Sequence, residues 1–196
     1  MIDRMAEVIL FHHALGVTPG VLAFADDLRA QGHVVHVPDL FDGKTFEQLE
    51  DGVAYARQAP VDDRAEAAAK AMPNEIVYAG WSLGVMVAQK LAQTRSGAKG
   101  AVLISSAVAP EEFGGPWPPG VPLQMHMMEN DEWAKDYDIP AARQIVANVE
   151  STELFLYPGD GHLIADSSAP DYDEKSASLL KQRVNFSILL TICSAN

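Results

Sequence analysis

The sequence predicts an α/β fold: one domain over residues 1–196, built on a doubly wound, mainly parallel six-stranded sheet flanked by helices. Short apolar runs, rich in β-branched and aromatic residues, alternate with helical patterns along the chain, as strands and crossover helices of a parallel sheet do. The length suits one domain with a sizeable core, and no repeat or low-complexity linker divides the chain. A strand, a sharp turn and a helix follow one another near the middle of the chain.

Six apolar runs are expected to be strands, at residues 8–11, 33–37, 76–79, 101–104, 121–127 and 154–157. Right-handed crossovers leave few ways to order such strands, and we expect the order 2-1-3-4-5-6. The direction of winding then reverses between the first and third strands. Ligands of such sheets bind at this reversal, beyond the carboxyl ends of the strands. A functional site is therefore expected where the loops after these two strands meet.

Helix start and stop signals lie between the strands. Thr18 is expected to cap a helix whose first residue is Pro19, and Gly32 to end it in the left-handed conformation. Thr45 and Gln48 match a capping box, which predicts a helix over about 46–58. Further helices are expected over about 62–71, 83–94, 139–149 (with Asp138 as a cap) and 171–183. The stretch 109–120, rich in proline and glycine, is expected to be an irregular loop.

The charge and the single cysteine exclude several classes of function. The chain has 27 acidic and 14 basic residues and a net charge of −13, so nucleic acid and anionic membrane are poor partners. Cys193 has no second cysteine with which to form an intramolecular disulfide. The N-terminus is not a signal-peptide pattern, and no apolar run is long enough to span a membrane. We expect a cytoplasmic protein.

Residues 80–84, Gly-Trp-Ser-Leu-Gly, match the nucleophile elbow G-x-S-x-G. The motif requires a strand before it and a helix after it, and both are predicted here. Two glycines suit a turn in which neighbouring side chains would clash. We expect Ser82 to be a catalytic nucleophile; the alternative is a tight turn with a purely structural role.

A serine nucleophile needs a base, and the base needs an acid that orients it. Asp131 and His162 each follow a predicted strand, and the order Ser, Asp, His is that of hydrolases that use this elbow. His162 is expected to accept the proton of Ser82, so that the rate rises with pH as His162 deprotonates. Glu129 is the rival for the acid, and His162 has the alternative of an ordinary loop histidine. Asp160 and Asp166 are expected on the surface.

The oxyanion site needs two N–H groups. We expect one from Leu83, which follows the nucleophile, and one from Ala14 in the loop after the first strand, with Leu15 as second choice. Of the adjacent His12 and His13, one is expected to be packed and the other, His13, to line the substrate pocket beside Leu15. Adjacent histidines in a strand point to opposite faces and no further ligand lies nearby, so no metal is expected. Trp81 and Trp117 are expected to wall the pocket; core packing is the alternative.

The chain resembles the dienelactone hydrolase family of the α/β-hydrolase superfamily from about Val8 to about Arg183. The resemblance rests on residues 10–16 (Leu-Phe-His-His-Ala-Leu-Gly), 37–41 (Val-Pro-Asp-Leu-Phe), 80–84 and 157–162 (Tyr-Pro-Gly-Asp-Gly-His). It implies a minimal α/β-hydrolase fold without a cap domain that hydrolyses esters or lactones through an acyl-enzyme and needs no cofactor.

The sequence departs from the founding members of this family at three places. Those members have cysteine at the elbow, where this chain has Ser82, and an acid where it has His13. They also have an arginine soon after the catalytic histidine, whereas residues 163–166 include no basic side chain. We therefore expect a small neutral ester as substrate. The alternatives are thioester hydrolysis or acyl transfer by the same residues, or a ligand-binding protein with low turnover. The apolar segment 186–196 is expected to dock on the core or in a homodimer.

Overall fold

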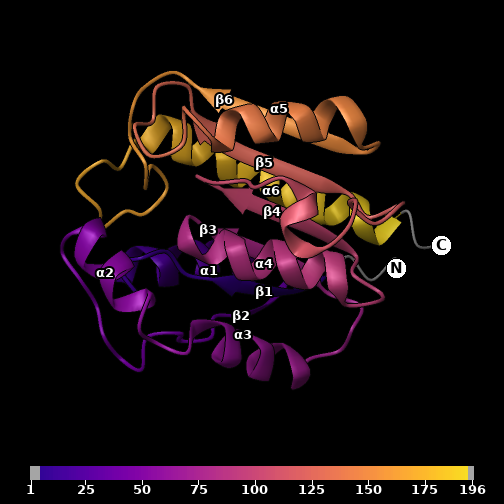
Figure 1. Cartoon of the computed structure of the whole chain (residues 1–196), viewed down its shortest axis with the longest axis horizontal. Helices are drawn as coiled ribbons and strands as arrows, with labels where there is room; N and C mark the ends of the chain where they lie inside the picture. Colours follow the sequence, from indigo (N-terminus) through magenta and orange to yellow (C-terminus); the bar gives the residue numbers. More distant parts are fainter. Residues whose placement is uncertain (1–4, 194–196) are drawn as a thin grey trace.

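Six parallel strands form one sheet in the order β2-β1-β3-β4-β5-β6 in the computed structural model, which describes residues 5–193 (Figure 1). The predicted fold class and strand order are confirmed. The strands are β1 (Glu7–Phe11), β2 (Val34–His36), β3 (Val77–Trp81), β4 (Gly100–Ile104), β5 (Leu123–Met128) and β6 (Thr152–Tyr157).

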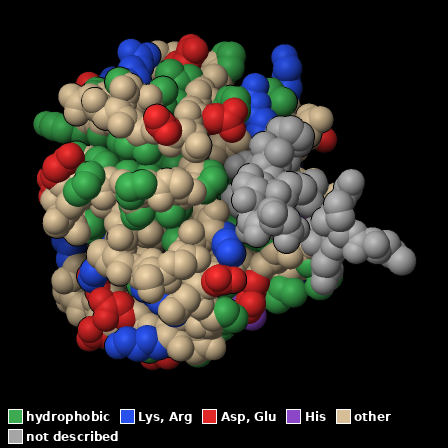
Figure 2. All heavy atoms as spheres, turned by 90° about the vertical axis from the view of Figure 1, so that its right-hand side faces the viewer, with side chains coloured by type: hydrophobic (Ala, Val, Ile, Leu, Met, Phe, Trp, Pro, Cys, Tyr) green, Lys and Arg blue, Asp and Glu red, His purple; other side chains and the backbone are tan. Residues whose placement is uncertain are grey.

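Helices cover both faces of the sheet. They are α1 (Pro19–Ala30), α2 (Leu49–Ala56), α3 (Val61–Lys70), α4 (Leu83–Thr94), α5 (Asp138–Asn148) and α6 (Glu174–Cys193), with a short 3-10 helix η1 (Pro110–Phe113). Helices α1 and α6 pack on one face, and α3, α4 and α5 pack on the other. Figure 2 views the end of the molecule near the two chain termini, where acidic and basic side chains are interspersed with apolar ones.

The two-sided burial follows from the alternation of side chains along each strand. In β1, Val8 and Leu10 join the core under α1 and α6, whereas Ile9 and Phe11 join the core under α3 and α4. Both sets need to be apolar, and this is why the strands read as continuous apolar runs. Among residues 5–193, no helix is long and apolar enough to cross a bilayer.

Strand register brings the functional loops to one edge. Phe11 at the end of β1 pairs with Gly80 of β3, and Trp81 pairs with Ile104 at the end of β4. The loop after β1 and the turn after β3 therefore leave the sheet side by side. The long loop after β6, orange in Figure 1, also lies at this carboxyl edge, at the left of the view.

The first helix begins and ends as the sequence predicts. The Thr18 hydroxyl accepts a hydrogen bond from the N–H of Val21 at 3.1 Å, and Gly32 has a φ of +96° just after the helix. The capping box at Thr45 is wrong: α2 begins at Leu49, with Gln48 as a cap that makes no side-chain bond. The N–H of Phe46 is instead bonded to the Leu15 carbonyl at 3.0 Å, which ties this segment to the loop after β1.

Two later helices differ from the predictions. The cap of α5 is Tyr137, because the Asp138 carboxylate accepts hydrogen bonds from Ser106 and from the N–H of Ala107. The last helix extends to Cys193, well beyond the predicted end, and Ile188 is buried in the core beside Val184. Ile188 of the apolar segment thus docks on the core; residues 194–196 lie outside the described range.

Candidate active site

Ser82 lies between β3 and α4 with φ +51° and ψ −114°. A residue with a side chain rarely adopts a positive φ, and such a conformation costs on the order of 1–3 kcal/mol. The surrounding structure holds it there: the N–H of Ser82 donates to the Ile104 carbonyl at 2.7 Å, and the Ser82 carbonyl accepts from Val85 at 2.9 Å. The turn therefore presents the hydroxyl at the carboxyl edge of the sheet, as the elbow motif predicts.

The two elbow glycines are required by close approach of backbones. A Cβ on Gly84 would lie 2.3 Å from the Phe11 carbonyl oxygen, because the first turn of α4 packs against the end of β1. A Cβ on Gly80 would lie 2.5 Å from the carbonyl oxygen of Gly84 itself. Neither glycine has a positive φ; the residue with the strained backbone is Ser82. The glycines thus set the distance between β1, β3 and α4.

The structure brings Ser82, His162 and Asp131 into one hydrogen-bonded chain. The Ser82 Oγ lies 2.7 Å from the His162 Nε2, and the His162 Nδ1 lies 2.7 Å from the Asp131 Oδ2. The three residues come from the loops after β3, β6 and β5. The Asp131 carboxylate is fully buried and the imidazole is 7% exposed, whereas the rival acid Glu129 is exposed. This arrangement can pass a proton from the hydroxyl to the imidazole.

Four further hydrogen bonds hold Asp131 and the loop of His162 in place. The other oxygen of Asp131, Oδ1, accepts the N–H of Trp133 at 2.9 Å. The loop of His162 is anchored through its backbone: the His162 carbonyl accepts the Ser105 hydroxyl, and the Asp171 carboxylate accepts the N–H groups of His162 and Leu163. The imidazole is thus fixed both by its ring nitrogens and by its main chain.

Two residues near the relay are absent from the sequence-based site. The Trp133 ring lies 5.8 Å from the His162 ring and is 46% exposed, so it forms an apolar wall beside the imidazole. The Asp138 carboxyl lies near enough to His162 to interact with it electrostatically. Burial raises the pKa of this carboxyl, although the Ser106 hydrogen bond opposes the effect. The sequence feature that could have indicated Trp133 is its position two residues after the predicted acid, in a loop at the carboxyl edge of the sheet.

The two N–H groups expected to bind an oxyanion are both without a protein partner among the residues that the structure describes. Within residues 5–193, the N–H groups of Ala14 and Leu83 have no protein hydrogen-bond partner. The N–H of Leu15, the second choice, donates to His13 Nδ1 at 3.2 Å and is therefore occupied. Two free donors remain, one from the loop after β1 and one from the start of α4.

His12 and His13 are both fully buried, so the prediction that His13 lines the substrate pocket is wrong. His12 Nε2 accepts the N–H of Leu40 at 3.0 Å, and its Nδ1 therefore donates to the His13 carbonyl at 2.7 Å. Burial lowers the pKa of His12 to about 4, and that carbonyl only partly opposes the effect. Burial likewise lowers the pKa of His13. Among the described residues, no three His, Cys, Asp or Glu side chains group as metal ligands.

Asp166 is a second correction, because it is fully buried rather than on the surface. Its carboxylate accepts hydrogen bonds from His13, Thr18 and Ser168. Burial would raise its pKa, but these bonds outweigh burial and hold the pKa well below the usual range. Asp160 is exposed, as predicted.

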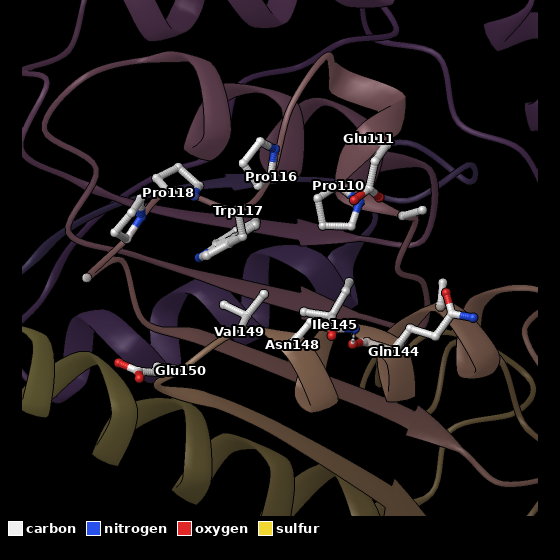
Figure 3. Close-up of a pocket in the computed structure, with 14 residues that line it drawn as sticks. Pro110, Glu111, Pro116, Trp117, Pro118, Gln144, Ile145, Asn148, Val149 and Glu150 are labelled. Carbon is white, nitrogen blue, oxygen red and sulfur yellow. Dashed lines mark hydrogen bonds between the residues drawn. The ribbon is translucent and has the colours of Figure 1, made fainter.

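The two tryptophans do not wall the site. Trp81 is fully buried between Phe24 and His13, with ring distances of 5.5 and 5.1 Å, and belongs to the core. Trp117 is 4% exposed and lies at a separate cavity of about 430 Å³ between the loop after β4 and α5 (Figure 3). Neither Ser82 nor His162 lines that cavity. The sequence alone does not show which aromatic side chain lies near Ser82. Leu15 is also largely buried, at 7% exposure, and packs in the core cluster under α1.

Several solved structures share this fold. A dienelactone hydrolase-like promiscuous phosphotriesterase from metagenomic libraries aligns with a TM-score of 0.75 and 16% identity, over 93% of this chain and 85% of that one. A putative dienelactone hydrolase from Klebsiella pneumoniae aligns with a TM-score of 0.73 and 18% identity, over 93% and 86%. A putative hydrolase of the α/β superfamily from Xanthomonas campestris aligns with a TM-score of 0.56 and 22% identity, over 96% and 99%.

A comparison with curated proteins finds no match. The model of the dienelactone hydrolase family matches residues 3–188, which is nearly the whole chain. Together with the elbow and the strand order, this match places the chain in the dienelactone hydrolase family, a family of hydrolases.

Proposed function

We propose that this protein is a serine hydrolase that cleaves small, neutral carboxylic esters or lactones through an acyl-enzyme. The observation that carries the proposal is the chain of two 2.7 Å contacts from Ser82 through His162 to Asp131, built on a strained elbow. A purely structural turn has no need for a positive φ at a serine whose hydroxyl meets an imidazole. Backbone strain is found preferentially where function requires it.

In the acylation step, Ser82 Oγ attacks the carbonyl carbon of the ester while His162 Nε2 takes the hydroxyl proton. The carbonyl oxygen becomes an oxyanion, which accepts hydrogen bonds from the N–H groups of Leu83 and Ala14. The carbon–oxygen bond to the alcohol then breaks, and the imidazolium returns the proton to the departing alkoxide. The products of this step are the free alcohol and a Ser82 ester of the acid.

In the deacylation step, a water molecule attacks the Ser82 ester and His162 takes one of its protons. The second tetrahedral oxyanion uses the same two N–H groups. Collapse breaks the bond to Ser82 Oγ, which regains a proton from the imidazolium, and the carboxylic acid leaves. In both steps Asp131 keeps the imidazole in the tautomer that has its proton on Nδ1, so that Nε2 faces the hydroxyl as an acceptor.

The surroundings of the relay favour an uncharged substrate. The carboxylate of Asp138 lies near the imidazole, and residues 163–166 include no basic side chain that would hold an anion. The half-exposed Trp133 ring offers an apolar surface beside His162. An ester with a short acyl group and an apolar alcohol fits these features.

The test is turnover of p-nitrophenyl acetate by the purified protein and by Ser82→Ala. We expect the variant to lose measurable turnover and labelling by a fluorophosphonate while keeping its melting temperature. The control is Ser178→Ala, because Ser178 is exposed on α6. Retained activity in Ser82→Ala would refute the nucleophile assignment. A panel of esters, lactones and thioesters then separates ester hydrolysis from thioester chemistry.

A further inference from the structure

His13 and Asp166 form a buried pair outside the proton relay. Their side chains are fully buried, and His13 Nε2 lies 2.8 Å from Asp166 Oδ2 although the residues are far apart in sequence. A charged side chain is not buried without compensation, since an unpaired one is strongly destabilising. The proposed hydrolytic steps do not use either side chain, so they do not explain why this polar pair is buried here.

The Asp166 carboxylate has as many donors as it has acceptor positions. Oδ2 accepts His13 Nε2–H and the Thr18 hydroxyl at 2.6 Å. Oδ1 accepts the N–H and the hydroxyl of Ser168 at 2.7 and 2.6 Å. Each carboxylate oxygen takes about two hydrogen bonds, so the anion is fully satisfied. The site lies at the first turn of α1, where the N-terminal end of a helix favours a negative charge.

These contacts fix the tautomer of His13. Its Nδ1 lies 3.2 Å from the N–H of Leu15, which can only donate, so Nδ1 has the lone pair. Nε2 must then have the proton, and it donates that proton to Asp166. The carboxylate thus selects the one tautomer of His13 that can hold the Leu15 N–H.

The bond from the Leu15 N–H constrains the turn that contains the Ala14 N–H. The N–H of Leu15 points inward to His13, and the neighbouring N–H of Ala14 has no partner within the described part of the chain. This is the N–H that we assign to the oxyanion site. Asp166 also bonds Thr18 in the loop after β1 while lying in the loop that follows His162. The pair thereby joins the loop of the oxyanion donor to the loop of the base.

We infer that His13 and Asp166 are positioning residues, which hold the Ala14 N–H toward Ser82 by capturing the neighbouring Leu15 N–H and tie that loop to the loop of His162. The inference rests on the proposed function. A positioning role differs from a packing role in what the loss of the Leu15 bond does. For a positioning role, the variant that loses this bond has the lower kcat even where its melting temperature is the higher.

Two variants of His13 separate its two hydrogen bonds. The Oδ1 of asparagine stands where Nδ1 stands in histidine, so His13→Asn keeps an acceptor for Leu15 and loses the bond to Asp166. The amide nitrogen of glutamine stands near Nε2, so His13→Gln keeps a donor to Asp166 and loses the acceptor for Leu15. A shift of about 1 Å in an active site can reduce a rate by about 10²-fold.

The expected results therefore cross over. We expect His13→Gln to melt at the higher temperature but to have a kcat about tenfold or more below that of His13→Asn, with KM changed little in both. A purely structural role gives the opposite result, in which activity follows stability in the two variants. That outcome overturns the inference.

His33 provides a matched control at the other end of the sheet. It is also buried, its Nδ1 accepts the N–H of Ala6 at 3.3 Å, and its Nε2 contacts the Asn185 side chain at 2.9 Å. The same asparagine and glutamine substitutions there should lower the melting temperature and leave kcat unchanged. A loss of kcat in the His33 variants would show that the His13 effect is not specific to the oxyanion loop.

A measurement without turnover separates this inference from the proposed function. The ¹⁵N shifts of the wild-type His13 ring should show Nε2 protonated and Nδ1 unprotonated, and the Leu15 amide should exchange more slowly than that of Ala14. In Asp166→Asn we expect the other tautomer and faster exchange at Leu15. An unchanged tautomer and unchanged exchange overturn the inference whether or not the protein hydrolyses esters. A wild type inert toward every ester, lactone and thioester and toward the fluorophosphonate instead overturns the proposed function.

Discussion

The replacement Asp131→Asn tests the relay most directly, because the structure dictates what the new amide does. Asp131 Oδ2 meets His162 Nδ1 at 2.7 Å, and Oδ1 accepts the N–H of Trp133 at 2.9 Å. The backbone N–H of Trp133 can only donate. The asparagine oxygen must therefore face Trp133, and its NH₂ group must face His162.

An NH₂ group at this position reverses the imidazole tautomer. Nδ1 then has to accept, Nε2 has the proton, and Nε2–H faces the Ser82 hydroxyl as a second donor. The base is lost although its geometry is preserved. In serine proteases the equivalent change reduces kcat by about 10⁴-fold. We expect a reduction of about 10³- to 10⁴-fold here, which corresponds to about 4–5.5 kcal/mol in the activation free energy.

The assay is the steady-state hydrolysis of p-nitrophenyl acetate, with urea unfolding as a check on stability. The matched control is Glu129→Gln, since Glu129 is the rival acid in the same turn and is exposed. We expect the control to keep its kcat within about twofold, as surface substitutions away from special features usually have small effects. If Asp131→Asn retained a tenth or more of the wild-type kcat, the tautomer argument would fail. If Glu129→Gln lost activity instead, the acid would have been wrongly assigned.

Three further predictions concern packing, pH and specificity. Gly84→Ala places a methyl group 2.3 Å from a backbone oxygen and should destabilise the fold by about 1–3 kcal/mol in urea unfolding, whereas Gly115→Ala, in open space with no positive φ, should be neutral or slightly stabilising. Burial, with the charge of Arg183, lowers the pKa of His126 from 6.5 to about 3, so the unfolded chain binds a proton that the folded chain does not. The free energy of unfolding should then fall by up to about 1.4 kcal/mol per pH unit as the pH drops from about 6.5 toward about 3. His126→Gln should remove this contribution to the pH dependence of stability. An unchanged pH dependence in that variant would contradict the reasoning. Trp133→Ala should lower kcat/KM for esters of apolar alcohols by about tenfold and that for methyl acetate much less; equal losses for both would argue against an apolar wall.

Much of the site could be predicted from the sequence because its signals are local. A turn that joins a buried strand to a helix, with glycines at both places where backbones approach within contact, identified Ser82. Asp131 and His162 followed from their places directly after strands, since the carboxyl ends of parallel strands share one edge. Alternation and crossover handedness reduced the possible strand orders to a few, and the expected order, one of these, is the observed one.

The misplaced residues have in common that their environment is made by segments distant in sequence. From the sequence, Asp166 is predicted to be a surface acid. In the fold, the loop after β6 packs against the start of α1, where Thr18 and His13 donate hydrogen bonds to Asp166. The helix expected from Thr45 was displaced because Phe46 is bonded to Leu15, a contact that the local capping pattern does not contain. Trp81 and Trp117 were both expected at the pocket, but the aromatic residue beside His162 is Trp133.

The sequence by itself determined which residues are candidates for the chemistry and at which edge of the sheet they emerge, because strand period, turn residues and chain order are local properties of the sequence. Only the tertiary structure decided which buried group has a charge, which tautomer each histidine adopts and which N–H is left free for an oxyanion. These properties depend on donors and acceptors counted in three dimensions, and each buried polar group takes its state from whichever partner reaches it.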